Sequence, residues 1–325
     1  MDTTTLRNAI SQSKEVAIIS HFRPDGDAIG SLLALGLALQ AMGKRVHLWN
    51  EDGVPARFAF LQGAALITRT PDALPAGVDT FICVDTGDLK RIGEAGMKLF
   101  AQAPLTINID HHETNTHYAS INVVEGEAAA CGCVLMNLIR EWGVALTRPI
   151  AEALFTAIST DTGSFQFSST TAEVMRMAAV LIDAGVDVGD INRRLHQEVP
   201  WSTFIMKREV LNNMQTYEQG AVVCYSMPAG KKAELGVGLE DTKDLVDIIR
   251  VLAGAKVAVI FEDLENGLIR ISLRSKDPRI NVANIASQHG GGGHAMAAGI
   301  RMRGELPACR EKVLETICTA VRTLS

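Results

Sequence analysis

The stretch SHFRPDGDAIGS at residues 20–31 places one imidazole and two carboxylates at the junction of two predicted elements. The apolar run at 16–20 predicts a short buried strand before it, and the Leu-rich run at 28–42 predicts a helix after it. The polar cluster therefore follows the carboxyl end of a strand, which is where ligands bind in open α/β sheets. A metal site is one interpretation, and a simple turn with an N-capping Asp is the other.

Two more predicted strands end in side chains of the types that bind metals. The run at 80–84 leads into Asp85, and the run at 105–109 leads into Asp110-His111-His112. Strand-like and helix-like segments alternate here, so the sequence predicts a parallel sheet with helices on both faces. Singly, each cluster is better explained as a helix cap or a satisfied histidine pair. Their common position at one edge of the sheet favours a shared site.

A further carboxylate, Asp161, follows the amphipathic helix predicted at 149–160. The segment around it is polar and rich in small residues, so helix capping is again the alternative interpretation. We predict that Asp161 is the next member of the same site.

Composition limits the class of protein. A chain of 325 residues suggests roughly two domains. The net charge of −6 gives no electrostatic footprint for wrapping long nucleic acid. The sequence shows no signal-peptide core and no long apolar span, and its six cysteines form no paired CxxC set. We therefore expect a cytoplasmic protein with free thiols and no membrane partner.

The second half predicts a hairpin and then a glycine-rich loop. Runs at 257–262 and 268–274 are strand-like and flank a turn at 265–267. The loop QHGGGGHA at 288–295 has four consecutive glycines, whose backbone amides can form a nest for an anion. Arg274 and His294 add charge beside it. A flexible loop is the alternative interpretation.

These motifs together resemble the DHH phosphoesterase superfamily over nearly the whole chain. The resemblance rests on His21-x-x-Pro24-Asp25-Gly26-Asp27, Asp85, Asp110-His111-His112, Asp161 and Gly291-Gly292-Gly293-His294. Within the superfamily the chain is similar to the bifunctional oligoribonucleases, or nanoRNases, that also remove the 3′-phosphate of phosphoadenosine phosphate. RecJ-like exonucleases are usually longer, and manganese-dependent pyrophosphatases lack the glycine-rich ending.

The resemblance implies an α/β protein of two domains with the active site in the cleft between them. A parallel-sheet DHH catalytic domain is expected at 1–190 and a helical linker at 191–218. A smaller α/β DHH-associated domain that binds substrate is expected at 219–325. A homodimer is also a family expectation.

The resemblance further implies two Mn²⁺ ions, with Mg²⁺ or Co²⁺ as substitutes, and imidazole with carboxylate suits such a metal. The expected metal ligands are His21, Asp25, Asp27, Asp85, His111 and Asp161. Asp110 is expected to orient the histidine pair, and His112 to face the phosphoryl group. Two such ions activate a water for in-line attack without a separate protein base.

The C-terminal domain is expected to choose the substrate. The residues expected to bind it are Arg274, Ser275, Lys276, Gly291, Gly292, Gly293 and His294. By the resemblance, the enzyme cuts RNA of di- to pentanucleotide length to 5′-mononucleotides from the 5′ end, and converts phosphoadenosine phosphate to AMP. Long duplex nucleic acid is not an expected partner.

Two other functions remain open from the sequence. One is a soluble phosphodiesterase for cyclic or linear dinucleotides such as cyclic di-AMP. The other is a nucleotide sensor that has lost catalysis. The sensor is disfavoured because all six family ligand positions are filled.

Overall fold

The computed structural model describes residues 3–238, 242 and 245–323. The chain divides into two compact units, Met1–Glu198 and Val199–Ser325, which are treated separately below. This division falls within the segment 191–218 that the sequence predicts as a linker. None of the helices in the described ranges has the length and apolar character needed to cross a membrane.

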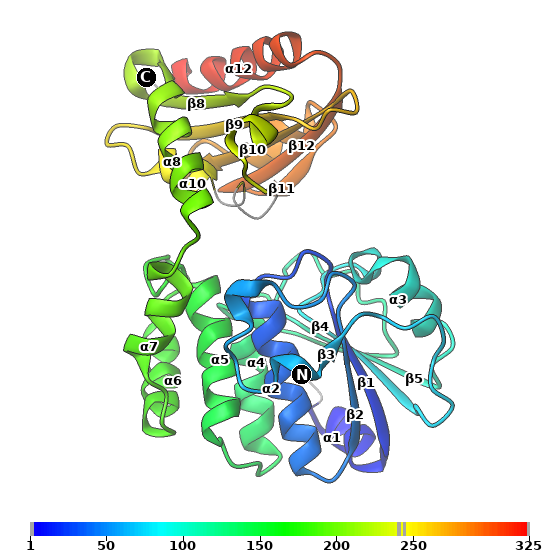
Figure 1. The fold of residues 1–325 in the computed structure, drawn as a ribbon. Coiled ribbons are helices and arrows are strands. Elements are labelled where there is room, and N and C mark those ends of the chain that lie inside the picture. Colours follow the sequence, from blue (N-terminus) through cyan, green and yellow to red (C-terminus); the bar gives the residue numbers. More distant parts are fainter. Residues whose placement is uncertain (1–2, 239–241, 243–244, 324–325) are drawn as a thin grey trace. The chain divides into compact units, whose positions relative to one another are not determined.

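The N-terminal unit is built on a six-stranded sheet in the order β3-β2-β1-β4-β5-β6 (Figure 1). All neighbouring strands run parallel. The strands are β1 (Glu15–Ser20), β2 (Arg45–Trp49), β3 (Ile67–Thr68), β4 (Thr80–Val84), β5 (Leu105–Asp110) and β6 (Ile121–Val124). The central strands β1, β4 and β5 are almost wholly buried, as expected for a parallel sheet covered on both faces.

Helices cover both faces of this sheet. One face packs against α1, α2, α4 and α5 around a large core that includes Ile18, Ile82 and Ile107. The other packs Ile19 and Phe81 beneath α3. The α-helices are α1 (Thr3–Gln12), α2 (Gly26–Ala41), α3 (Gly93–Phe100), α4 (Cys131–Glu141), α5 (Arg148–Asp161), α6 (Ala172–Asp183) and α7 (Val188–Asn192). Short helical turns are η1 (Ala56–Phe58), η2 (Ala64–Leu66), η3 (Leu89–Ile92) and η4 (Arg193–Gln197).

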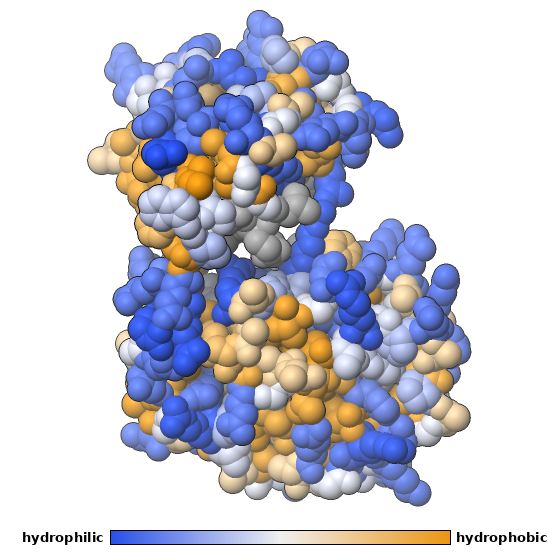
Figure 2. All heavy atoms as spheres, viewed as in Figure 1, coloured by the Kyte–Doolittle hydropathy of each residue, from blue (hydrophilic) through white to orange (hydrophobic). Residues whose placement is uncertain are grey.

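Helix α2 begins within the polar stretch at residues 20–31. Its N-cap is Asp25, whose carboxylate accepts from the backbone N–H of Ala28 at 3.0 Å. The helix is buried along most of its length, which explains its weak polar face. Figure 2 shows further apolar side chains on the surface of the N-terminal unit around this region.

The C-terminal unit has a second six-stranded sheet, in the order β11-β12-β10-β9-β8-β7. Only the β8–β9 pair among these neighbours is parallel. The strands are β7 (Gln215–Tyr217), β8 (Val222–Met227), β9 (Val257–Asp263), β10 (Leu268–Ser275), β11 (Gly292–His294) and β12 (Ala297–Arg303). The predicted hairpin is therefore confirmed as β9 and β10.

Helices cover one face of this second sheet and part of the other. Helices α11 (Val282–Ser287) and α12 (Leu306–Arg322) pack on one face, and α8 (Trp201–Asn213) and α10 (Leu245–Arg250) pack over β8 and β9 on the other. The helices α9 (Lys231–Leu235) and η5 (Glu218–Gly220) are short. On the α8 side, β10 and β12 present partly exposed polar side chains instead of core residues.

All six cysteines are buried and unpaired. Cys83, Cys131 and Cys133 lie in the first unit, and Cys224, Cys309 and Cys318 lie in the second. Burial raises the pKa of each thiol, to about 12 for Cys83. These thiols act as small apolar side chains.

Candidate metal centre and nucleotide-binding face

The structure brings the six expected metal ligands together at one edge of the N-terminal sheet. His21 follows β1, Asp85 follows β4 and His111 follows β5. Asp27 lies in the first turn of α2, Asp25 caps that helix, and Asp161 is the last residue of α5. Because parallel strands end at the same edge, residues far apart in sequence converge there.

The ligand atoms include two neighbouring groups of suitable size for a cation. His21, Asp25 and Asp85 make one group, and Asp27, His111 and Asp161 make the other. In the first group, His21 Nε2 lies 3.4 Å from Asp85 Oδ2. In the second, His111 Nε2 lies 3.4 Å from Asp161 Oδ2 and 3.7 Å from Asp27 Oδ2.

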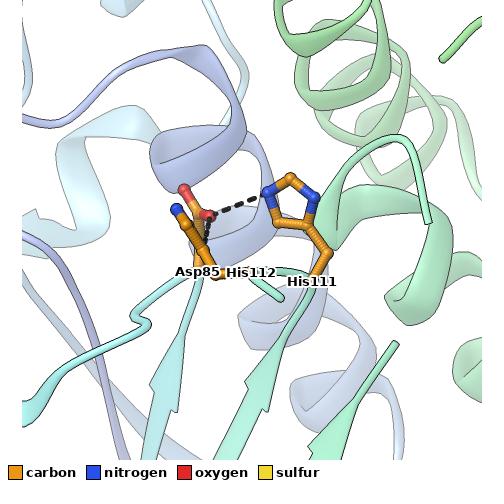
Figure 3. A group of neighbouring side chains, drawn as sticks. All are labelled: Asp85, His111 and His112. Atoms are coloured by element: carbon orange, nitrogen blue, oxygen red, sulfur yellow. Dashed lines mark ion pairs between the residues drawn. The ribbon is translucent and has the colours of Figure 1, made fainter. Parts of the chain in front are cut away.

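Asp85 links the two groups. Its Oδ2 faces His21, and its Oδ1 lies 3.6 Å from His111 Nε2 (Figure 3). One carboxylate thus presents an oxygen to each group, which is the arrangement that a pair of cations sharing one bridging ligand requires. Asp85 also belongs to a third group of ligating atoms, with His111 and His112.

Backbone contacts fix the ligating histidines. The Nδ1 of His111 donates to the carbonyl of Ala128 at 3.1 Å, and the Nδ1 of His21 donates to the carbonyl of Phe22 at 2.8 Å. Each contact keeps a proton on Nδ1, so Nε2 is the ring nitrogen that faces the carboxylates. This is how metal-binding histidines are usually oriented.

Asp27 is held by the start of α4. Its carboxylate accepts from the backbone N–H groups of Cys131 at 2.6 Å and Gly132 at 3.0 Å, and from the hydroxyl of Ser31 at 2.8 Å. The N-terminal end of α4 supplies otherwise unpaired donors and a favourable dipole for this anion. The side chain is therefore fixed although it is buried.

The electrostatics show a site crowded with negative charge. Burial and the nearby charge of Asp85 raise the pKa of Asp161 to about 7, and the same causes raise the pKa of Asp27. Burial opposes ionisation of Asp85, yet hydrogen bonds from His111 and His21 outweigh it and hold its pKa well below its usual range. Burial also opposes the charging of His21, but Asp25 and Asp85 raise its pKa to about 10. Protons here occupy positions that divalent cations would take.

The side chain of Asp110 does not point to the two cation groups but orients His112. Its Oδ1 accepts from His112 Nδ1 at 2.8 Å, and its Oδ2 accepts from the amide of Asn115 at 2.6 Å. Asp110 is fully buried. Asn115 thus belongs to the site although the sequence analysis did not single it out, since a lone Asn in a loop carries no signal.

The C-terminal unit separates the residues that the sequence grouped for substrate binding. Residues of β10 alternate, so Arg270, Ser272 and Arg274 are partly exposed on one face. Ser275 lies on the opposite face and is buried, and its hydroxyl donates to the carbonyl of Asp277 at 2.9 Å. The Nζ of Lys276 donates to the carbonyl of Leu252 at 2.8 Å. These contacts favour structural roles for Ser275 and Lys276.

A cavity of about 480 Å³ lies on the face that carries Arg270. Its lining is formed by Arg270, Ile271, Ser272, Gly290, Gly291, Gly292, Gly299, Ile300 and Arg301. Glycine is required at position 291, because a Cβ there would lie 2.8 Å from Ile300 Cγ1 and would also contact the carbonyl oxygen of Gly299. Gly293 and His294 continue along β11, outside the lining.

The sequence analysis missed Arg270, Ser272 and Arg301. The period-two pattern of β10 was a sufficient signal for the first two. Arg301 faces Arg270 across the β10–β12 pair, and this follows only from the strand register. Two guanidinium groups thus flank a floor of exposed glycine backbone, which is a suitable surface for a phosphate or carboxylate.

Comparison with known proteins identifies the family. Residues 15–158 match the DHH family, N-terminal domain, and residues 219–323 match the DHHA1 domain. A bifunctional oligoribonuclease and PAP phosphatase NrnA from Thermus thermophilus is 36% identical over 304 residues, covering 93% of this chain and 89% of the relative. The chain belongs to the DHH phosphoesterase family. A bifunctional oligoribonuclease and PAP phosphatase NrnA from Bacillus subtilis is 25% identical over 319 residues, covering 97% of this DHH chain and 98% of that protein.

Solved structures agree with this DHH assignment. A crystal structure of an exopolyphosphatase-related protein from Bacteroides fragilis has a TM-score of 0.87 and 25% identity, covering 99% of this chain and 95% of that one. RecJ from Thermus thermophilus in complex with Mn²⁺ has a TM-score of 0.54 at 15% identity, covering 98% of this chain and 54% of RecJ, and shows shared fold only. The resemblance and the α/β fold class drawn from the sequence are therefore confirmed.

Proposed function

We propose that this DHH phosphoesterase holds two divalent cations, with manganese preferred, and hydrolyses short oligoribonucleotides and phosphoadenosine phosphate. The observation that carries the proposal is the position of Asp85. Its Oδ2 faces the group that contains His21, and its Oδ1 faces the group that contains His111. The relatives named as oligoribonuclease and PAP phosphatase support the choice of substrate. The crystal structure of RecJ with Mn²⁺ supports the choice of metal.

The donor set fits the cations. His21, Asp25 and Asp85 would hold one, and Asp27, His111 and Asp161 would hold the other, with Asp85 shared. When bound, such a pair supplies an activated water and positive charge for the phosphoryl oxygens. Imidazole nitrogen combined with carboxylate oxygen favours a transition metal over Ca²⁺.

The remaining residues position the substrate's phosphoryl group. Asp110 fixes the ring of His112 through Nδ1, and we assign the opposite nitrogen, Nε2, to the phosphoryl oxygen. Asn115 holds Asp110 in place from its other side. We assign His112 the role of contacting the reacting group and Asp110 the role of a positioning residue.

The cavity of the C-terminal unit would bind the anionic end of the nucleotide. Arg270 and Arg301 flank the exposed glycine backbone, and Arg274 lies on the same face of β10. Arg270 also contacts the buried carboxylate of Glu262, and Arg274 Nε lies 3.5 Å from Asp247 Oδ1. These contacts restrict the guanidinium groups, which lowers the entropy lost when an anion binds.

The test is a manganese-supported assay on a 5′-phosphorylated RNA dinucleotide and on phosphoadenosine phosphate. Asp85→Asn should lower kcat on both by about a thousandfold, the scale of removing one group that stabilises developing charge. Arg274→Ala should raise KM by about tenfold with little change in kcat. Ser275→Ala, on the opposite face of the same strand, is the matched control and should leave KM unchanged.

A third substrate, cyclic di-AMP, completes the assay. Hydrolysis of cyclic di-AMP with neither of the other substrates turned over would overturn the substrate assignment and leave the metal centre standing. A wild-type protein inactive on all three with manganese would overturn the proposal.

A further inference from the structure

We propose that the cavity beside α4 and α6 binds the nucleobase of the nucleoside on the 3′ side of the scissile phosphate. This nucleoside keeps the phosphate when the bond from phosphorus to the 3′-oxygen of the 5′ nucleotide breaks. This inference rests on the proposed function. The cavity has a volume of about 420 Å³, and its lining includes Glu125, Glu127, Cys133, Asn137 and Glu173. That volume lies within the usual range for small-molecule sites.

The cavity lies at the same edge of the sheet as the metal centre. Strand β6 ends at Val124 beside Asp110 of β5, and the N–H of Glu125 donates to the backbone carbonyl of Asp110 at 3.0 Å. Helix α6 begins at Ala172, after the segment that follows Asp161. The cavity is therefore bordered by the stretch that follows β6, which is hydrogen-bonded to the last residue of β5, and by the first turns of α6.

Two direct connections join the cavity wall to the ligands. Ala128 lines the cavity, and its carbonyl accepts from Nδ1 of His111 at 3.1 Å. Cys133 also lines it, from the first turn of α4, whose opening N–H groups hold Asp27. Burial and the charge of Asp27 raise the pKa of the Cys133 thiol to about 12, which disfavours this thiol as a nucleophile.

The chemistry of the lining indicates the kind of ligand. Three glutamate carboxylates accept hydrogen bonds, the Asn137 amide both donates and accepts, and Val174 and Met177 supply apolar surface. None of the described residues lining the cavity is a lysine or an arginine, so it is not suited to a phosphate. A flat ring bearing amino groups matches all three features, because carboxylates and amides read the amino edges of bases.

The substrate explains why that base belongs to the 3′ side of the scissile phosphate. The arginines of the C-terminal unit are assigned to the anionic end of the nucleotide. What remains beyond the scissile phosphate of a dinucleotide is a second nucleoside, tethered next to the metal centre. Phosphoadenosine phosphate has no such nucleoside, because its 3′-phosphate is terminal. A change in this cavity should therefore affect the reaction of the dinucleotide and not that of phosphoadenosine phosphate.

The experiment compares Glu173→Trp, which fills the cavity from the first turn of α6, with Met175→Trp, the same substitution on an exposed residue of α6 outside the lining. Within the described parts of the chain, the ion pair of Glu173 is an exposed one with Arg176, so its loss has little effect on stability. Glu173→Trp should raise KM for the dinucleotide by about tenfold. It should leave KM for phosphoadenosine phosphate within about twofold of the wild-type value. Met175→Trp should match wild type on both.

Base preference gives a second measurement. With the 5′ base held constant, wild type should favour adenine, guanine or cytosine over uracil at the 3′ position by about threefold to tenfold, since uracil has no amino group. Glu173→Gln should reduce that preference. Equal loss on both substrates in Glu173→Trp, or an unchanged dinucleotide KM, would overturn the inference. Wild-type turnover in the same assay reports separately on the proposed function.

Discussion

Asp85 holds its carboxylate between His21 and His111 from a backbone conformation that few residues adopt. Its φ of 52° lies in the left-handed region, where Asp and Asn are the side chains tolerated best after Gly. Backbone strain of this kind accumulates at functional sites, where the surrounding fold imposes it. Asn therefore keeps the backbone at position 85 and removes only the charge, which makes Asp85→Asn a cleaner test of the bridging role than Ala.

The carboxylate of Asp161 costs the metal-free protein stability. It is about one-third exposed and lies among other carboxylates, and its pKa is raised from 3.8 to about 7. The folded protein thus binds this proton more tightly than the unfolded chain does. The contribution of Asp161 to stability is favourable below about pH 4 and is lost as the pH rises to about 7.

Asp161→Asn should therefore raise the Tm of the metal-free protein at pH 8 by about 2 °C, allowing for solvent screening. The gain should shrink toward pH 5, where Asp161 is protonated in the folded state. Thermal scans with a chelator measure this, and Asp72→Asn, at an exposed carboxylate, is the control. The increase in Tm on adding manganese should be larger for the wild type than for Asp161→Asn. A variant less stable than wild type at pH 8 without metal would contradict the argument.

At the level of single residues, the sequence predicted which side chains converge better than it predicted the groups that orient those side chains. His21, Asp85 and His111 were predictable because each follows a strand, and the ends of parallel strands converge. The carbonyl of Ala128 that orients His111 carries no sequence signal, because every residue has a carbonyl. Arg301 needed the register of β10 with β12.

Among the helices, α2 and α5 form a close contact that supports the metal centre. Gly30 of α2 faces Ala153 and Ala157 of α5, and a Cβ at Gly30 would lie 2.9 Å from the Cβ of Ala157 and would also contact the carbonyl oxygen of Ala153. Asp27 lies on α2, and Asp161 ends α5. The distance between these helices therefore sets the distance between two of the expected ligands.

Gly30→Ala should destabilise the protein and weaken manganese binding. The better helix propensity of Ala favours folding by up to about 1 kcal/mol, but the clash with backbone atoms of α5 costs about 1–3 kcal/mol, so the clash prevails. Thermal unfolding and manganese titration by calorimetry measure both effects. Gly43→Asn is the matched control, because its φ of 79° suits Asn and nothing lies within 4 Å. An unchanged Tm in Gly30→Ala would contradict this prediction, because it would show that α5 shifts to accommodate the added methyl group at no cost.

The sequence predicted whole elements where their apolar patterns were long. Strands β1, β4 and β5 were predicted within one residue at each end, because each is a continuous buried run. The edge strands β3 and β6 were not predicted. They are short and only partly buried, so their composition differs little from that of a loop.

On the scale of the molecule, each unit has its own hydrophobic core. Cores on both faces of the first sheet lie within residues 1–198, and cores on both faces of the second lie within residues 199–325. Each unit is long enough to bury a core alone. The sequence predicted two domains from length and motifs, and the boundaries 1–190 and 219–325 remain predictions.

We expect the two units to fold when expressed separately and to divide the binding functions. Manganese should raise the Tm of residues 1–198 and leave residues 199–325 unchanged, since the expected ligands all lie in the first. Phosphoadenosine phosphate should raise the Tm of residues 199–325 through the arginine-flanked cavity. Differential scanning calorimetry measures both. A manganese response in residues 199–325, or failure of either piece to fold, would contradict this division.

The burial of every cysteine makes the native protein inert toward thiol reagents. Maleimides and similar alkylating agents gain access only when a core opens. Because the thiols are shared between the two units, peptide mapping of labelled cysteines distinguishes opening of one unit from opening of the other. Because the native thiols are buried, a cysteine introduced at the surface would be the one site at which a maleimide fluorophore attaches to the folded protein.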